Sequence, residues 1–380
     1  MDATKEGRKH NLPIVDLKAQ YESLRDEITS AIAGVLEMQH FILGPNVAAL
    51  EREIAELCSS QFAVGVASGT DALILALRAA GVGIGDEVIV PAFSFVATAD
   101  AVSILGAVPV FADIDPLTFN INATHAATLV TDRTRAIIPV HLYGQSADMD
   151  EISALASRHR LIVIEDCAQA LGATWKDRPT CSHGDYGCIS FFPSKNLGAY
   201  GDGGMITVRS AQEAASLKML RSHGSARKYH SDVQGMNSRL DELQAAILRV
   251  KLPHLRDWNE RRRHVAAMYR EALGQLEEVT LPFESSNVRH VYHQFTIRVA
   301  RRDEVQKALF ASGIQTFVYY PVPLHLQPMY AHLDYKRGDL PTSENAAKEA
   351  LSLPMFPEMT EEDVMRVAGC LRECLAAPVV

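Results

Sequence analysis

Six short apolar runs, separated by segments with helical periodicity, occupy residues 60–210 of this chain. They are DEVIVPA (86–92), AVPVFADI (107–114), RAIIPVHLY (135–143), RLIVIEDCAQA (160–170), CISFFP (188–193) and GMITVRS (204–210). Continuous apolar strands that alternate with helices are typical of a mostly parallel sheet with helices on both faces. Ligands of such sheets bind beyond the carboxyl ends of the strands. We therefore predict an α/β fold and look for function in the residues that follow each run.

The pattern changes after about residue 250. A charged helical stretch (255–273) precedes an alternating strand (292–300), an aromatic segment (315–330) and a closing helix near 360–376. A chain of 380 residues also exceeds what one hydrophobic core usually supports. We predict that residues 1–250 hold an N-terminal segment and a large α/β domain, and that residues 251–380 form a smaller α+β domain.

Composition narrows the possible partners. The net charge of −9 and the absence of a long basic run argue against nucleic acid and anionic membranes. No apolar run is long enough to span a bilayer, and the charged first twenty residues lack the apolar region of a signal peptide. The six cysteines are scattered, without CxxC pairs or histidine neighbours at metal-ligand spacing. We expect a cytoplasmic protein with free thiols and no metal site.

The segment ASGTDALILALRAAG (67–81) starts with residues that are typical of a helix N-terminus. Ser68, Gly69, Thr70 and Asp71 form a strong N-terminus, and Gly81 ends the pattern. Free N–H groups at such an end bind phosphate, although the same residues also serve as a plain helix cap. The chain has no GxxxxGK[ST] loop, and GVGIGDE lacks the GxGxxG spacing. A nucleoside triphosphate or a Rossmann-bound dinucleotide is therefore not expected.

Two further segments place candidate ligand contacts after strands. Asp166 ends the buried run RLIVIED, where a carboxylate is costly unless a cation meets it. An aspartate there can hold a protonated ring nitrogen, or it can cap a following helix. Phe93 and Phe95 follow another strand, so each belongs either to the core or to a stack against a flat cofactor.

The fourth segment, SFFPSKNLGAYGDGG (190–204), contains a single lysine among apolar and small residues. Such surroundings lower the pKa of Lys195 and leave a fraction of neutral, nucleophilic amine, as a Schiff base requires. Ser190 lies five residues upstream. A phosphate site, an aspartate after a strand, an aromatic stacker and a Schiff-base lysine together describe a pocket for pyridoxal phosphate (PLP).

These motifs resemble those of the DegT/StrS-type nucleotide-sugar aminotransferases, a fold-type-I PLP-dependent family, over nearly the whole chain. Besides the segments above, the resemblance is carried by FILGPNVAALEREIAE (41–56), GDEVIVPAFSFVATADAV (85–102), PVFADIDPLTFNI (109–121), GMNSRLDELQAAIL (235–248) and YYPVPLHLQP (319–328). The fold implied is a mostly parallel central sheet sandwiched by helices, with a smaller C-terminal α+β domain.

The resemblance implies a role for each matching residue. Lys195 forms the Schiff base with PLP and later moves a proton, while Asp166 pairs with the ring nitrogen. Phe95 stacks on the ring and Gln169 lies near its opposite side. The other implied cofactor contacts are Gly69, Thr70 and Ser190 at the phosphate, with Ser68 beside them, and Asn237, which reaches the phosphate of the neighbouring subunit. A homodimer with two shared sites follows from the role of Asn237.

The implied substrate contacts are Arg239, Tyr319, Tyr320 and His325. Tyr319 stands where many relatives have histidine, so the sugar substituent read there is open. The basic stretch RSHGSARKYH (221–230) is either a solvated loop or part of the dimer interface.

The implied reaction moves an amino group from L-glutamate, through pyridoxamine phosphate, to a keto sugar on a nucleotide diphosphate. The product is an amino sugar for a surface polysaccharide or a glycosylated natural product. LYGQSADMD (142–150) and NSRLDELQAAILRVKL (237–252) favour 3-keto over 4-keto sugars. The alternatives are a cyclitol or another carbocyclic ketone as acceptor, a non-catalytic regulatory member, and a sugar dehydratase, whose pattern has histidine in place of Lys195.

Overall fold

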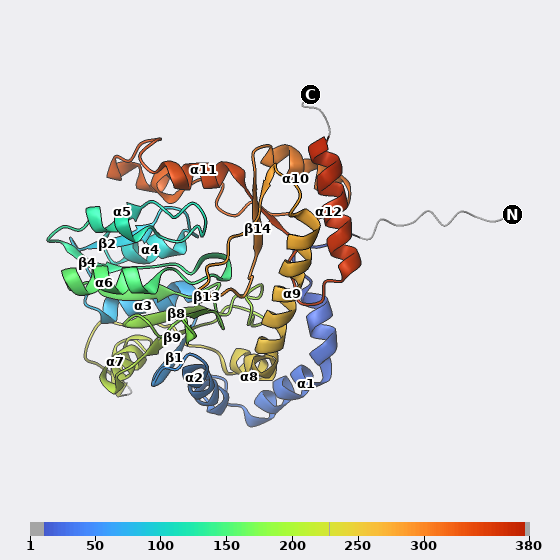
Figure 1. The fold of residues 1–380 in the computed structure, drawn as a ribbon. Coiled ribbons are helices and arrows are strands. Elements are labelled where there is room, and N and C mark those ends of the chain that lie inside the picture. The colour runs from blue at the N-terminus through green and yellow to red at the C-terminus, as the bar shows by residue number, and fades with distance from the viewer. Residues whose placement is uncertain (1–10, 228, 377–380) are drawn as a thin grey trace.

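A seven-stranded sheet forms the centre of residues 62–208 in the computed structural model, which describes residues 11–227 and 229–376 (Figure 1). Its order is β1-β9-β8-β5-β4-β2-β3. The strands are β1 (Phe62–Val66), β2 (Glu87–Pro91), β3 (Val108–Ala112), β4 (Thr134–Ile137), β5 (Ile162–Asp166), β8 (Tyr186–Ser190) and β9 (Gly204–Val208). β9 runs opposite to the other six strands of this sheet, which all run in one direction; this confirms the mostly parallel sheet predicted from the sequence.

Each of the six apolar runs overlaps one strand of this sheet. The run 135–143 contributes less than expected, because β4 ends at Ile137, two residues before Pro139, which has no N–H to donate to a ladder. β1 was not predicted from the sequence; its short segment FAVGV carries a glycine in its interior. Glycine is uncommon inside strands, and the run is too short to stand out.

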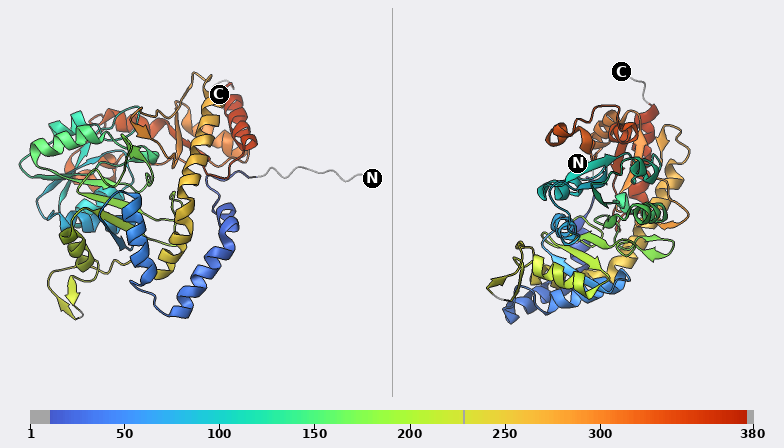
Figure 2. Two further views of the ribbon diagram at one scale, coloured as in Figure 1. Left: turned by 60° about the horizontal axis from the view of Figure 1, so that its bottom comes forward. Right: turned by 90° about the vertical axis from the view of Figure 1, so that its left-hand side faces the viewer.

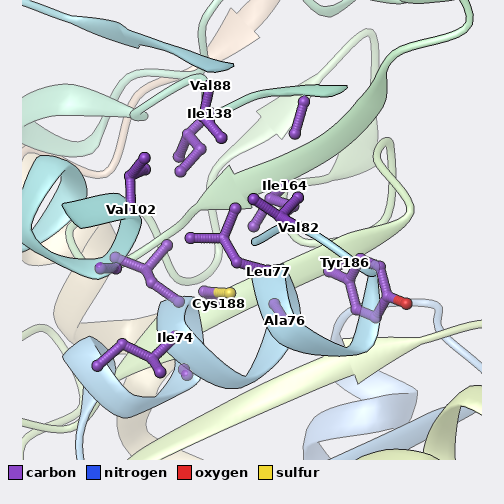
Figure 3. Close-up of a cluster of buried hydrophobic side chains, with 14 of the residues drawn as sticks. Ile74, Ala76, Leu77, Val82, Val88, Val102, Ile138, Ile164, Tyr186 and Cys188 are labelled. Atoms are coloured by element: carbon purple, nitrogen blue, oxygen red, sulfur yellow. The ribbon is translucent and has the colours of Figure 1, made fainter. Parts of the chain in front are cut away.

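Helices cover both faces of the sheet, and the strand residues alternate between them. Val88, Ile138 and Ile164 point to one face, where they pack against α3 (Gly69–Ala79) and α4 (Ala97–Ile104) (Figure 3). Ile89 and Ile137 point to the other face, in the cluster that includes α5 (Ala123–Thr128) and α6 (Met149–His159). Because both faces are buried, the strands read as continuous apolar runs.

A second, three-stranded sheet organises the C-terminal part of the chain. It has the order β12 (Val279–Thr280), β14 (Phe295–Val299) and β15 (Ala350–Leu353), and packs against α9 (Leu255–Leu273), α10 (Arg302–Ala311) and α12 (Glu361–Ala376). Leu12 joins this cluster through a backbone bridge to Ile314, so the N-terminal segment lies against the C-terminal part. The division at residue 250 stays a prediction; that residue falls inside α8 (Glu242–Lys251).

The remaining elements connect and flank the two sheets (Figure 1). They are α1 (Leu17–Met38), α2 (Pro45–Leu57), α7 (Ala211–Leu220), α11 (Pro341–Glu349), β6 (Thr174–Trp175), β7 (Arg178–Pro179), β13 (Val288–Arg289), β10 (Ser225–Arg227) and β11 (His230–Ser231), with short 3-10 turns at Leu142–Gly144, Leu252–His254, Leu324–Leu326 and Pro328–Leu333. The β10–β11 hairpin projects from the body of the molecule near α7 (Figure 2).

Nowhere in the part of the chain that the structure describes is there a helix with the length and apolarity needed to cross a bilayer. The expectation about a signal peptide concerns the first twenty residues, of which 1–10 lie outside the described residues.

Helix α2 takes its N-terminal cap from a distant part of the chain. Its own N-cap residue, Gly44, has no side chain to offer. The fully buried carboxylate of Glu242, at the start of α8, accepts hydrogen bonds from the backbone N–H groups of Gly44 (3.0 Å), Val47 (3.1 Å) and Asn46. This contact fixes α8 against α2, and α8 in turn supports the lysine loop described below.

Replacing Glu242 by alanine should lower the free energy of unfolding by about 2 to 3 kcal/mol, because buried N–H groups lose a charged acceptor. Differential scanning calorimetry measures the effect. Glu53→Ala is the matched control: it removes a half-exposed carboxylate that pairs with Arg249 between the same helices, and should change stability by less than about 1 kcal/mol. Equal losses in the two variants would contradict the capping role.

Candidate active site

A cavity of about 670 Å³ lies at the carboxyl ends of β1, β2, β5 and β8. Most residues that the sequence singled out line it together, although they come from segments far apart in the chain. These are Ser68, Gly69, Thr70, Phe95, Asp166, Gln169, Ser190, Lys195, Tyr319 and Tyr320. The topology accounts for the gathering, since the ends of parallel strands meet at one edge of a sheet.

Lys195 lies in the wall of this cavity on the loop that follows β8. Burial lowers the pKa of its ammonium to about 8, although the nearby charge of Asp166 acts in the opposite direction. Among the described residues no carboxylate comes within ion-pair distance of Nζ. Near neutral pH the fraction of Lys195 that is neutral amine, the nucleophilic form, is therefore much larger than for an ordinary lysine.

Asp166 ends β5 with its carboxylate buried and facing the cavity. Thr98 Oγ1 donates a hydrogen bond to Oδ2 (2.9 Å), and the backbone N–H of Ala168 donates to Oδ1 (3.2 Å). Burial raises the pKa of the carboxyl above its ordinary value in spite of these bonds and of the charge on Lys195. The carboxylate is thus held in place by neutral donors and is short of a cation, so a cationic ring bound in the cavity would stabilise it.

The start of α3 faces the same cavity and is packed closely against β8. Ser68 Oγ caps the helix by accepting a hydrogen bond from the N–H of Asp71 (3.1 Å). A Cβ on Gly69 would lie 2.6 Å from Ser190 Cβ, so only glycine lets the helix approach this close. The N–H groups at the helix start and the hydroxyls of Thr70 and Ser190 line one end of the cavity, an arrangement that suits a phosphate.

Gln169 is fixed by two hydrogen bonds. Its Oε1 accepts from the N–H of Tyr143 (2.7 Å), and its Nε2 donates to the hydroxyl of Tyr320 (2.9 Å). Tyr143 and Tyr320 both have positive φ, 58° and 61°. Such backbone is costly for bulky residues and clusters at functional sites. The amide of Gln169 therefore ties the strand side of the cavity to the aromatic segment that contains Tyr319 and Tyr320.

Phe95 is 58% exposed and lies in the cavity wall, whereas Phe93 is fully buried in the core. This separates the two alternatives that the sequence left open for these phenylalanines. The residue left accessible in the cavity is the one that the family resemblance assigns to stacking.

Three residues named from the resemblance do not line the cavity. His325 is buried, with its Nε2 3.4 Å from a carboxylate oxygen of Glu344. Asn237 is exposed, and Arg239 is partly exposed on the same segment. Within one chain, the structure therefore does not bring His325, Asn237 or Arg239 to the other site residues.

A buried group of His141, Glu165 and Cys167 lies behind Asp166. The carboxylate of Glu165 accepts from His141 Nε2 (2.9 Å) and from the backbone N–H groups of Cys181, His183 and Gly184 (2.7 to 3.0 Å). Burial opposes its ionisation, but these bonds outweigh burial and lower the pKa of Glu165. The N–H of Ala147 donates a hydrogen bond to His141 Nδ1. The acceptor atoms of His141 and Glu165 are therefore already used in hydrogen bonds that support β5.

Sequence reasoning missed Thr98, which orients Asp166, and His293, which lies in the cavity wall. Thr98 lies inside a helix, where a threonine does not by itself indicate a functional role. His293 belongs to the strand-like stretch YHQFTIRVA and reads there as an ordinary core histidine.

The loop that carries Lys195 is held by Lys251, a fully buried lysine. Lys251, at the end of α8, donates from Nζ to the carbonyl oxygen of Gly198 (2.7 Å) and lies 4.0 Å from the ring centroid of Tyr200. Gly198 itself is packed so tightly that a Cβ there would meet the carbonyl of Pro193 at 2.1 Å. Lys251 thus satisfies a carbonyl in the turn that sets the position of Lys195.

The pH dependence of stability tests this description of Lys251. Burial lowers the pKa of its ammonium to about 8, against 10.5 for an ordinary lysine. Between these values the unfolded chain binds more protons, so the contribution of Lys251 makes unfolding free energy rise with pH. In Lys251→Met the rise should be smaller by up to about 3 kcal/mol. Urea unfolding at about pH 7.5 and 9.5 measures it, with Lys307→Met, an exposed lysine, as control. Identical pH slopes for Lys251→Met and the parent would contradict the description.

Comparison with known proteins identifies the family. Residues 22–372 match the DegT/DnrJ/EryC1/StrS aminotransferase family, and the chain belongs to it. Members of this family are PLP-dependent aminotransferases. The resemblance inferred from the motifs is thereby confirmed.

Two similar sequences span almost the full length of the chain. A protein of Geobacillus stearothermophilus named pleiotropic regulatory protein is 52% identical, over 96% of this chain and 98% of its own length. UDP-N-acetyl-3-dehydro-alpha-D-glucosamine 3-aminotransferase of Acidithiobacillus ferrooxidans is 51% identical, with the same coverage of 96% and 98%.

Two similar solved structures support the fold. The structure of S. venezuelae DesV in complex with a ketimine intermediate is 44% identical, with a TM-score of 0.95, over 97% of this chain and 100% of that one. NtdA from Bacillus subtilis with bound cofactor PMP is 33% identical, with a TM-score of 0.91, over 98% of this chain and 87% of that one. The predicted fold type I architecture is confirmed.

Proposed function

We propose that this chain is a PLP-dependent aminotransferase that moves an amino group from L-glutamate to a 3-keto sugar carried on a nucleotide diphosphate. The observation that carries the proposal is the pairing, in one cavity, of a lysine amine of lowered pKa with a buried carboxylate that lacks a protein cation. The name of the Acidithiobacillus ferrooxidans relative, a 3-aminotransferase of a UDP sugar, supports the choice of acceptor.

The residues of the cavity fit PLP at each of its functional groups. The start of α3, with Thr70 and Ser190, would hold the phosphate. Asp166 would accept a hydrogen bond from the protonated ring nitrogen, and Phe95 would cover one face of the ring. Lys195 would hold the aldehyde carbon through its amine.

The chemistry divides between the cofactor and the chain. PLP, when bound, supplies an electron-poor ring that stabilises charge on the carbon next to a substrate amine. Asp166, a buried carboxylate whose orientation Thr98 fixes, would keep the ring nitrogen protonated. Lys195 would take up and release a proton at Nζ, and its lowered pKa suits both steps.

The acceptor and the donor both carry negative charge, yet Lys195 is the one lysine or arginine that the described residues place in the cavity wall. We propose that a second copy of the chain supplies a further cation, Arg239, near the substrate of its partner's site. The neutral side chain of Asn237 would reach the cofactor phosphate of the same site. Their exposure on a segment outside the cavity supports this shared arrangement. So do the exposed apolar side chains at the end of α1 and in the segment that joins it to α2, which are Leu36, Met38, Phe41 and Ile42.

Tyr319 and Tyr320 line the cavity and are the substrate contacts that we propose from this chain. We also propose the cytoplasm as the compartment, because its reducing conditions keep thiols such as those of the six free cysteines unpaired.

Lys195→Ala tests the central role in this proposal. The variant should still bind PLP through its phosphate and ring contacts, but without the absorbance of the covalently held cofactor. Amino transfer should fall by at least about 10³-fold, since the proton carrier is gone. Spectrophotometry and a coupled glutamate assay measure the two effects, with Lys307→Ala as an exposed-lysine control. Normal turnover in Lys195→Ala would refute the role.

The acceptor is tested by mass spectrometry of products. The PLP-loaded protein is incubated with L-glutamate and a panel of UDP- and dTDP-linked 3-keto and 4-keto hexoses. We expect an amino sugar from a 3-keto member, together with 2-oxoglutarate. Preferential conversion of a 4-keto sugar would overturn the regiochemistry. Cofactor binding without transfer to any sugar, while glutamate leaves the cofactor absorbance unchanged, would instead favour a regulatory role, as the name of the 52% identical relative suggests.

A further inference from the structure

Phe317 is a phenylalanine of the cavity wall that the proposed mechanism does not use. Its side chain is 51% exposed, close to the 58% of Phe95, the residue assigned to stack on the cofactor ring. An aromatic face that is left open in a cavity gains free energy when a ligand covers it. Phe317 is therefore a candidate ligand contact on the same grounds as Phe95.

A second open ring, Phe192, belongs to the cofactor end of the cavity. Phe192 is also 51% exposed and lines the cavity. Its backbone N–H donates to Oγ of Ser190 (3.3 Å), one of the groups proposed for the cofactor phosphate, and its carbonyl accepts from the N–H of Lys195 (2.8 Å). Phe317 has no such connection, and its neighbour Tyr319 is a proposed substrate contact.

Phe317 forms the outer end of a row of aromatic rings. Its ring centroid lies 4.7 Å from that of Tyr319, whose own centroid lies 6.0 Å from that of Tyr320. The centroid of Tyr320 lies in turn 5.5 Å from that of Phe93. Exposure falls along the row, from 51% at Phe317, through two half-buried tyrosines, to 0% at Phe93. The row therefore runs from the open part of the cavity to the buried core.

The inner part of this row is tied to the cofactor end of the cavity. The hydroxyl of Tyr320 accepts a hydrogen bond from Nε2 of Gln169 (2.9 Å), and Gln169 follows Asp166 by three residues. A substrate that reacts between Asp166 and Lys195 would therefore have its reacting end on the Tyr320 side. Its opposite end would extend toward Phe317.

The backbone of Phe317 is fixed, which gives its ring a defined place. The N–H of Phe317 donates to the carbonyl of Ser352 (3.1 Å), and the N–H of Ser352 donates to the carbonyl of Phe317 (2.8 Å). This pair of bonds joins Phe317 to β15 of the C-terminal sheet. A ring held in this way loses little conformational freedom when a ligand stacks on it.

We propose that Phe317 stacks on the nucleobase of the nucleotide-linked acceptor. This inference rests on the proposed function and adds the part of the substrate that Phe317 contacts. In a nucleotide sugar the base lies at the end opposite to the sugar, and it is the one flat ring with two apolar faces. Every base offers such a face, so stacking serves UDP- and dTDP-linked sugars alike. It supplies binding energy in a wall where Lys195 is the one lysine or arginine among the described residues.

Binding of UDP alone tests this contact without turnover. Isothermal titration calorimetry is carried out on the full-length chain loaded with pyridoxamine phosphate. We expect Phe317→Ala to weaken UDP binding about 5- to 100-fold, the usual effect when a base loses its aromatic partner. Phe317→Tyr keeps a flat ring and should bind UDP within about twofold of the parent. Phe310→Ala removes a 72% exposed phenylalanine of α10, outside the cavity, and should leave UDP binding unchanged.

The possible outcomes separate this inference from the proposed function. Equal UDP affinity in Phe317→Ala and the parent would overturn the stacking and leave the proposed function intact. Failure of the parent to bind either UDP or dTDP would overturn the nucleotide-linked acceptor itself. Phe317→Ala should also keep the rate at which L-glutamate changes the cofactor absorbance, because this donor has no base. Dissociation of a dimer in Phe317→Ala, measured by light scattering, would place the ring at a subunit contact and overturn the inference.

Discussion

The arrangement of this site depends on one buried carboxylate. Asp166 ends β5 among neutral donors, and burial raises the pKa of its carboxyl. A carboxylate in such a place is unfavourable unless a cation reaches it. The chain's own cation, Lys195, lies outside ion-pair distance of Asp166, but close enough for the charge of Asp166 to raise the pKa of the lysine ammonium. A ring bound in the cavity between them would interact with both groups if it were cationic at the end near Asp166 and reactive toward an amine at the end near Lys195.

The surrounding structure keeps these two groups apart and in position. Glu165 anchors β5 from behind through four hydrogen bonds, and Thr98 orients Asp166 from α4. Two sets of contacts hold the loop of Lys195: the hydrogen bond from Lys251, and the hydrogen bond between the amides of Asn196 and Asn259. Residues of the C-terminal part thus take part in holding a loop of the large sheet, which joins the two halves of the chain at the site.

Much of this could be read from the sequence, and the reason is topological. Asp166 and Ser190 each end a strand and Phe95 follows one, and parallel strands bring such positions together. The contacts that the sequence did not reveal depend on pairings across the chain. Glu242 caps a helix about 200 residues away, and His293 owes its position to Asn196 and Arg262. No periodicity in the sequence predicts such pairings, and the roles proposed for Asn237 and Arg239 would depend on a second chain.

Borohydride reduction of the PLP-loaded protein, followed by peptide mapping, tests the central claim most directly. Among the residues that the structure describes, burial lowers the pKa of two lysines, Lys195 and Lys251, and of these two only Lys195 lies in the cavity wall. The account predicts a phosphopyridoxyl group on Lys195 alone, and none on any lysine after Lys195→Ala. A label on Lys251, or no label on Lys195, would contradict it.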